Sequence, residues 1–145
     1  MKCSDIKRVA EMNSECISFE DTYSDYDWLL SQVRKQNLAI ILARVDGEIS
    51  GYLIYRVCSE HIESVRRGVS GKFRRRGVGT KLSKKLIAVS TRLKKPIYTY
   101  VSKSNLKSLN GNLKVGYLID WIDPEWVYIK YTPKNMNKSR VIVDG

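Results

Sequence analysis

The segment Arg74–Leu82, with the sequence RRRGVGTKL, constrains the fold most, because two glycines join a predicted strand to a predicted helix. The strand is expected at His61–Val69, and the helix at Gly77–Leu93, where apolar residues recur at helical spacing. Gly77 and Gly79 let the backbone turn tightly and come close to a ligand. This unit indicates a fold in which helices pack on a sheet.

The same turn has the chemistry of an anion site. The first amides of a helix have no partner within it, and the helix dipole favours negative charge there. Lys72, Arg74, Arg75 and Arg76 add positive charge, so a pyrophosphate suits this place. A dinucleotide fingerprint would need glycine where Leu82 stands, and a Walker P-loop would need GxxxxGK followed by Ser or Thr. On these residues alone, a glycine-rich, basic helix start without a ligand remains an alternative.

Charge is distributed unevenly along the chain. Residues 1–65 contain 7 Lys and Arg and 11 Asp and Glu, whereas residues 66–145 contain 19 and 4, for a total net charge of +11. From Ser64 to Ile119 there is no acidic residue. This half should attract anions: a phosphorylated cofactor, a nucleic acid or an acidic partner. A solvated basic face kept for solubility is the alternative.

The remaining segments alternate between helix and strand patterns. Helices are expected at Asp5–Ser18, with Ser4 as cap, at Asp25–Lys35 and at Asn105–Lys114. Strands are expected at Leu38–Val45 and Ser50–Val57, around Asp46-Gly47, and at Pro96–Val101, as a buried strand. Two further strands are expected at Tyr117–Asp120 and Trp126–Tyr131, around Asp123-Pro124. We therefore expect a mixed α/β (α+β) three-layer fold with a mainly antiparallel sheet and flanking helices. One domain should cover residues 1–132, followed by a polar tail at 133–145.

Composition excludes several classes of protein. Cys3, Cys16 and Cys58 have spacings of neither a zinc site nor a disulfide framework, so free thiols in a reducing compartment are expected. Because His61 is the single histidine, a Ser-His-Asp triad or a multi-histidine metal site is a poor candidate, and no metal is expected. No apolar run is long enough to span a membrane, and the N-terminus lacks a signal-peptide pattern, so we expect a cytoplasmic protein.

Three segments together resemble the GNAT superfamily of acyl-CoA-dependent N-acyltransferases. The R-x-x-G-x-G pattern at Arg74–Gly79, after a strand, is similar to motif A of that superfamily. The residues N-x-x-S and then K-x-G-Y within Asn105–Tyr117 are similar to its N-x-x-S-x-x-x-Y-x-K-x-G-F segment, and the strand with Gly51 is similar to its third strand. The resemblance covers residues 38–131.

The resemblance implies acetyl-CoA as co-substrate. The strands at 61–69 and 96–101 would splay apart and admit the pantetheine arm, and a Lys or Arg would meet the 3′-phosphate. The implied cofactor-binding residues are Arg67, Gly68 and Val69 along pantetheine, Arg74, Arg75, Arg76, Gly77, Val78, Gly79 and Thr80 around the pyrophosphate, and Asn105, Ser108 and Asn112 from the later segment.

The implied reaction is acetyl transfer, by direct attack, to a primary amine: a protein N-terminus, a lysine or a small polyamine. A free lysine amine has a pKa of about 10.4 and must lose a proton before it attacks, which a carboxylate can accept. Glu63 is the candidate base and Glu60 the second choice. The alternative for Glu63 is a solvent-facing strand glutamate or an ion pair with an arginine.

The chain departs from the family pattern at Asn112, where many members carry a tyrosine general acid. An asparagine can hydrogen-bond a thiolate but cannot readily protonate it. Tyr117 is the candidate acid, and Tyr128 and Tyr131 are near enough in sequence to be considered; each can instead be a core or pocket-wall aromatic. The departure leaves open a protein with lost or weak catalysis.

Two partner classes follow from charge. A cationic acceptor, such as a basic peptide, suits the acids of the N-terminal half, Glu20, Asp21, Asp25 and Asp27. The alternative is a basic module that docks on RNA or the ribosome, with Tyr98 and Tyr100 among lysines. Because no RNA-binding motif is present, nucleic acid is not favoured. A homodimer is compatible with the sequence, which does not decide the oligomeric state.

Overall fold

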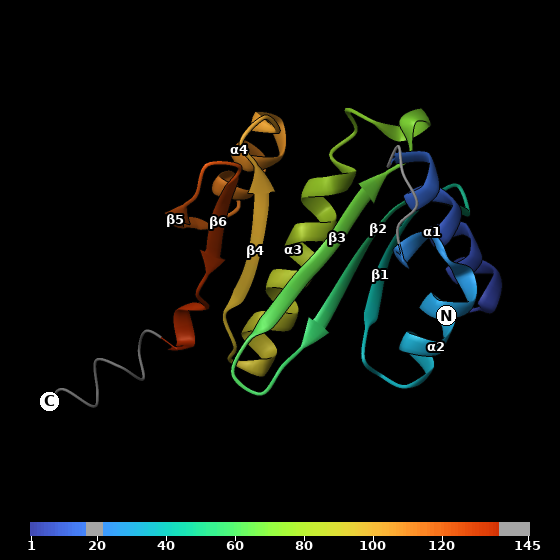
Figure 1. Cartoon of the computed structure of the whole chain (residues 1–145), viewed down its shortest axis with the longest axis horizontal. Coiled ribbons are helices and arrows are strands. Elements are labelled where there is room, and N and C mark those ends of the chain that lie inside the picture. The colour runs from blue at the N-terminus through green and yellow to red at the C-terminus, as the bar shows by residue number, and fades with distance from the viewer. Residues whose placement is uncertain (17–21, 137–145) are drawn as a thin grey trace, which may run out of the picture. The chain divides into compact units, whose positions relative to one another are not determined.

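The computed structural model describes residues 1–16 and 22–136 (Figure 1). Its helices are α1 (Cys3–Cys16), α2 (Tyr26–Arg34), α3 (Val78–Leu93) and α4 (Leu106–Lys114), and its strands are β1 (Ala39–Val45), β2 (Glu48–Val57), β3 (Ile62–Val69), β4 (Ile97–Ser102), β5 (Leu118–Ile122) and β6 (Trp126–Tyr131). The strand order is β1-β2-β3-β4-β6-β5. The expected mixed α/β fold with a mainly antiparallel sheet is confirmed. None of the described helices is long and apolar enough to cross a membrane.

Internal contacts divide the chain into two compact units. The first comprises Met1–Arg56 and Val65–Leu82, and the second comprises Val57–Ser64 and the described part of Ser83–Gly145. Each unit is therefore built from two separate stretches of the chain.

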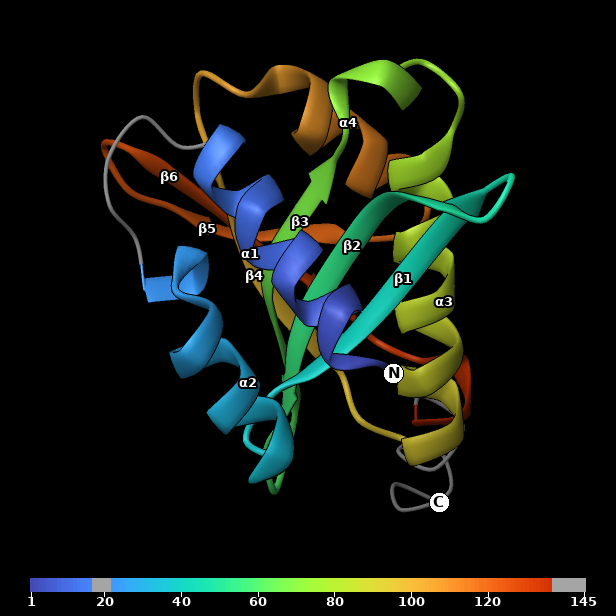
Figure 2. The ribbon, with the colours of Figure 1, turned by 90° about the vertical axis from the view of Figure 1, so that its right-hand side faces the viewer.

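In the first unit, α1 and α2 pack on each other, and both contribute to a core that they share with the hairpin of β1 and β2 (Figure 2). The two strands meet at Asp46 and Gly47, both of which have positive φ, as a two-residue hairpin turn requires. The core between helices and hairpin consists of Ile6, Val9, Ala10, Met12, Leu29, Leu38, Ile49, Tyr52 and Ile54. Burying each of the larger side chains stabilises the fold by roughly 1.5–3 kcal/mol.

The start of α1 differs from the sequence expectation. The helix begins at Cys3, so Ser4 lies inside it and does not cap it. The carboxylate of Asp5 instead accepts the amide of Lys2 at 3.1 Å and the guanidinium of Arg44 at 2.9 Å. These two donors lower the pKa of Asp5. The expected end of this helix, Ser18, lies outside the described residues.

In the second unit, β4 pairs with β6 and β6 pairs with β5, all antiparallel (Figure 1). The prediction that Pro96–Val101 is a buried strand is corrected: Ile97 and Val101 are buried, but Tyr100 is 52% exposed. Side chains alternate between the two faces of a strand, and only one face of β4 carries a core. The other face carries tyrosines that line a pocket.

Candidate active site

The strand–turn–helix motif forms as expected, and its turn lies within the first unit, together with the end of β3 and the start of α3. After β3, a 3-10 turn covers Gly71–Phe73, and α3 begins at Val78. The first hydrogen bond of α3 runs from the amide of Lys81 to the carbonyl of Gly77, at 3.1 Å. The amides before Lys81 therefore have no partner within the helix. Arg75 and Gly77 have φ of 66° and 75°, which bends the chain sharply before the helix begins.

Basic side chains surround this turn. Arg74, Arg75 and Arg76 are exposed, and the Arg76 guanidinium lies 5.7 Å from the ring centre of Phe73. Lys72 forms an ion pair with Glu48 at 3.0 Å. Amides and guanidinium groups at one helix start have the donor chemistry that holds a pyrophosphate.

The glycines of β2 and β3 have a packing role. A Cβ at Gly68 would lie 2.5 Å from Cε1 of Tyr52, and a Cβ at Gly51 would lie 2.9 Å from the carbonyl oxygen of Gly68. In contrast, a Cβ at Gly79 would lie 3.6 Å from Cζ of Arg67, which is ordinary contact. The Arg67 guanidinium also donates to the Gly79 carbonyl at 3.4 Å. Gly68 is thus required by Tyr52, whereas Gly79 has room beside it.

In the second unit, the side-chain amide groups of Asn105 and Asn112 form hydrogen bonds to the backbone of α4. Asn105 caps the helix, because its Oδ1 accepts the amide of Ser108 at 3.2 Å. Asn112 is buried, and its Nδ2 donates to the carbonyl of Ser108 at 3.0 Å. Both side chains hold the helix, and their contact with a cofactor stays a prediction.

The second unit contains a pocket of about 240 Å³. It is lined by His61, Glu63, Tyr98, Thr99, Tyr100, Asp120, Trp121, Tyr128 and Ile129. Strand register explains this set: Glu63 lies beside Tyr98 in the parallel pair of β3 and β4, and Tyr100 lies opposite Tyr128 in the pair of β4 and β6. Trp121 stacks on Tyr128, with ring centres 4.6 Å apart and planes at 9°.

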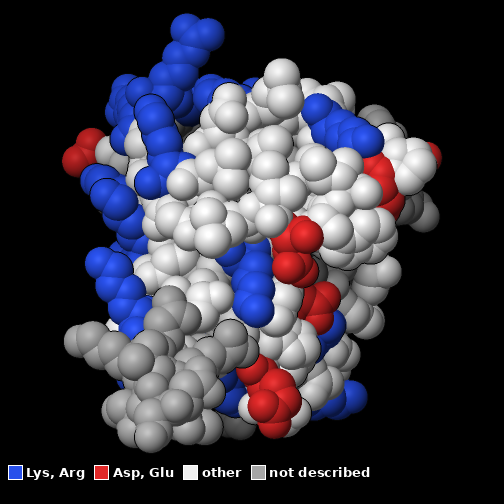
Figure 3. Space-filling view, turned by 90° about the vertical axis from the view of Figure 1, so that its left-hand side faces the viewer, with Lys and Arg blue, Asp and Glu red and all other residues white. Residues whose placement is uncertain are grey.

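Two carboxylates give the pocket an acidic character in a basic protein. Glu63 and Asp120 are the acids on either side of the acid-free stretch, and both line the pocket. Asp120 falls where the β5–β6 register shifts, between Ile119 and Trp121, and such a bulge re-aims a side chain. Figure 3 views the side on which β5 and β6 lie and shows acidic side chains within a largely uncharged surface. Lys130 lies nearby, with its Nζ 5.3 Å from the ring centre of Tyr98.

A third carboxylate, Asp123, fixes the turn between β5 and β6. It accepts the amides of Trp126 at 2.6 Å and Glu125 at 2.8 Å, and these bonds lower its pKa. It also accepts the hydroxyl of Tyr128 at 3.0 Å. Donation to this anion raises the pKa of Tyr128, which makes the phenol a weaker acid than usual.

The other candidate catalytic residues lie elsewhere. Glu60 is exposed in the turn after β2 and does not line the pocket. Tyr117 is 3% exposed and packs against Tyr131, with ring centres 5.8 Å apart. Asp25 caps α2 by accepting the amide of Trp28 at 3.2 Å. Glu20 and Asp21 lie outside the described residues.

The sequence interpretation did not single out Asp120, and it considered His61 only as the single histidine of the chain. Both line the pocket beside Glu63. The sequence did contain a pattern that points to Asp120, because Glu63 and Asp120 are the two acidic residues that flank the acid-free stretch. The signal for His61 was its spacing of two residues from Glu63, which puts both side chains on one face of a strand.

A family model described as the acetyltransferase (GNAT) family matches residues 6–117. No curated protein matches the chain in sequence.

Several solved structures share the fold. Ard1 from Thermoplasma volcanium is 16% identical with a TM-score of 0.78, covering 92% of this chain and 94% of that chain. The ribosomal-protein-S18-alanine N-acetyltransferase from Escherichia coli is 11% identical with a TM-score of 0.73, covering 91% and 90%. The structure of yncA from Salmonella typhimurium with acetyl-CoA is 14% identical with a TM-score of 0.73, covering 91% and 90%. At these identities the likeness establishes the fold.

Proposed function

The chain belongs to the GNAT acetyltransferase family, and from that premise we propose that it transfers an acetyl group from acetyl-CoA to a primary amine. One observation carries the proposal: Glu63 lines a pocket with aromatic walls and a second carboxylate, Asp120. A protonated amine is attracted to such carboxylates and to the faces of the tyrosine and tryptophan rings.

The turn before α3 is assigned to the cofactor. The amides from Arg75 to Thr80 hold the pyrophosphate, and Arg74 and Arg76 add charge at the same helix start. The sharp bend at Arg75 and Gly77 and the amides before Lys81 support this assignment. Bound acetyl-CoA supplies the acetyl group as a thioester. Acetyl-CoA is present in the structure of yncA from Salmonella typhimurium, which shares the fold.

The pocket is assigned to the acceptor. Glu63 takes a proton from the amine nitrogen, which frees the lone pair for attack. Asp120 holds the cationic form of the amine at the mouth of the pocket before that step. Tyr117 remains the predicted acid for the leaving thiol. The pocket is small enough to take one extended side chain or one chain end at a time, which suits a lysine or a protein N-terminus.

The first test measures binding of acetyl-CoA by isothermal titration. We expect binding by the wild-type protein and its loss in Gly79→Trp, since the larger side chain fills the space beside the turn. Gly71→Ala is the matched control, because a Cβ there meets nothing within 4 Å. No binding by the wild type would refute the cofactor assignment.

The second test measures release of free CoA with a panel of cationic peptides and polyamines. Glu63→Gln should lower kcat by about 10²–10⁴-fold, the usual contribution of a general base. Glu60→Gln should leave kcat unchanged, because Glu60 is exposed and does not line the pocket. Equal effects of the two substitutions would remove Glu63 from the proposed role.

A further inference from the structure

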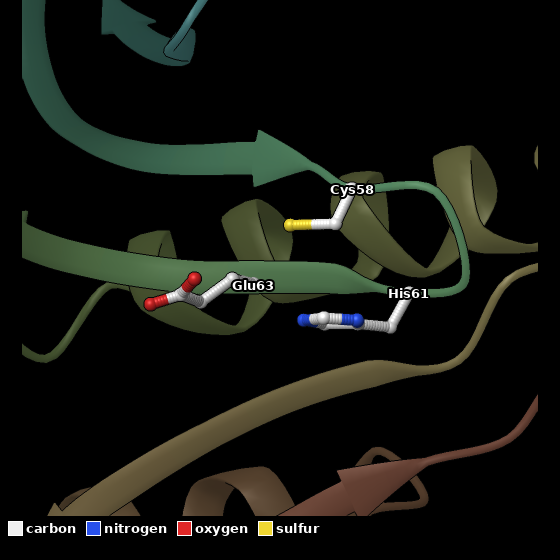
Figure 4. Close-up of side chains that lie close together, drawn as sticks. All are labelled: Cys58, His61 and Glu63. Carbon is white, nitrogen blue, oxygen red and sulfur yellow. The ribbon is translucent and has the colours of Figure 1, made fainter.

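Three side chains with different ligand chemistry converge at the turn between β2 and β3. They are the thiol of Cys58, the imidazole of His61 and the carboxylate of Glu63 (Figure 4). One ligand atom from each lies within 4.8 Å of the other two, and all three residues are partly buried. In Figure 4 the three side chains extend to the same side of the strands.

The backbone brings these side chains together. The amide of Cys58 donates to the carbonyl of His61 at 2.8 Å, which closes the turn around Ser59 and Glu60. Residues that face each other across a hairpin have side chains on the same face. His61 immediately precedes β3 and Glu63 is the second residue of that strand, so the two side chains share that face as well. The convergence therefore follows from strand register.

Neighbouring groups hold the turn in place. The ammonium of Lys95 donates to the carbonyl of Cys58 at 2.7 Å. The ring of His61 packs edge-to-face on Tyr98, with ring centres 5.3 Å apart. Such contacts restrict the rotamers of a ligand set before any ion arrives.

We propose that Cys58, His61 and Glu63 form a site for a divalent transition metal of the zinc class, with a fourth position open to water. Zinc binds Cys, His and Glu at about 2.0–2.3 Å in tetrahedral geometry, which puts neighbouring ligand atoms roughly 3.3–3.8 Å apart. The ligand atoms lie within 4.8 Å of one another, so each separation has to shorten by about 1.5 Å or less to reach this spacing. Thiolate and imidazole ligands select zinc or its neighbours over magnesium and calcium, which prefer oxygen. The sequence expectation was that no metal would bind.

The site has a consequence for catalysis that rests on the proposed function. Glu63 cannot accept a proton from an amine while its carboxylate is bound to a metal ion. Zinc should therefore inhibit acetyl transfer, and a chelator should restore it. The inhibition would couple the activity to free zinc through a single carboxylate.

The test is a titration with Co²⁺, which gives an absorption band when a thiolate binds it. The parent protein carries Cys3→Ser and Cys16→Ser, so that Cys58 is its only thiol. We expect one Co²⁺ per chain and displacement by Zn²⁺. Cys58→Ser should abolish the band, and His61→Gln should weaken binding by at least about tenfold. Glu60→Gln, in the same turn, is the matched control and should bind as the parent does.

A second measurement on the folded parent avoids any loss of structure in the variants. Zn²⁺ should slow alkylation of Cys58 by iodoacetamide, as located by mass spectrometry. No band with Co²⁺, a band that survives Cys58→Ser, or unprotected alkylation would each overturn the site and leave the proposed acetyl transfer untouched. Metal binding without inhibition would contradict the coupling, because Glu63 would then either not bind the metal or not act as the base.

Discussion

Gly68→Ala should destabilise the protein because the new methyl group has no room. A Cβ at this position lies 2.5 Å from Cε1 and 2.7 Å from both Cζ and the hydroxyl oxygen of Tyr52. Tyr52 is 2% exposed, and its hydroxyl donates to Oδ1 of the fully buried Asn13. The ring can move away only by breaking that bond.

The cost follows from these two effects. Overpacking a core typically costs about 1–3 kcal/mol, and a buried polar group that loses its partner costs about 1–3 kcal/mol more. We expect Gly68→Ala to lower the free energy of unfolding by about 2–6 kcal/mol in a urea titration, the sum of the two effects. The melting temperature should fall by roughly 5–20 °C.

Gly79→Ala is the matched control. Its Cβ makes ordinary contacts of 3.6 Å or more, and Gly79 lies in the first turn of α3, where alanine is the better helix former by up to about 1 kcal/mol. This variant should be as stable as wild type or more so. If Gly68→Ala and Gly79→Ala had equal stability, the close packing of Tyr52 on β3 would be refuted.

Three further predictions concern charge, capping and chemistry. Arg44 and the amide of Lys2 lower the pKa of Asp5 below its ordinary value of 3.8. The stability that the Asp5 carboxylate contributes is therefore present at neutral pH and is lost as the pH falls through the folded pKa. Urea titrations of Asp5→Asn and of the wild type should differ at pH 7 and converge at low pH. Asn105→Ala removes the cap of α4 and should lower the free energy of unfolding by about 1 kcal/mol. Asn105→Asp keeps a capping oxygen and should retain most of that stability. Equal losses in the two variants would mean that the cap is not what stabilises the helix. Tyr117→Phe keeps the ring packing and removes the hydroxyl, so kcat should fall by about 10²-fold; an unchanged kcat would assign the acid role to another group.

Local patterns predicted the parts of the fold that depend on neighbours in sequence. The hairpin at Asp46-Gly47 follows from the need for positive φ at both residues. The strand–turn–helix at Gly77 follows from apolar spacing and glycine. The start of α1 was misplaced because Ser4 looks like a cap, whereas the capping contact comes from Asp5, inside the first turn. Its carboxylate reaches back to the amide of Lys2, so the helix begins at Cys3, and the ion pair with Arg44 holds the carboxylate there.

The pocket could not be predicted in the same way. Its lining comes from β3, β4, β5 and β6, and residues distant in sequence meet there through strand register. The position of Asp120 depends on a register shift between Ile119 and Trp121, which no local sequence pattern predicts. For the group at Cys58, His61 and Glu63, only the spacing of two residues between His61 and Glu63 can be read from the sequence. Cys58 joins them through a turn that the structure shows, closed by the bond from its amide to the carbonyl of His61.

β5 is the last strand in the order, with a neighbour on one side only among the described residues. It is exposed throughout, with Leu118 at 73% and Trp121 at 56%. A bare apolar edge of this kind invites strands of other molecules to add to it, which leads to aggregation. Asp120 is the one charged residue of β5, and the pocket uses it together with Trp121. Solubility and an open pocket therefore make opposing demands on one short strand.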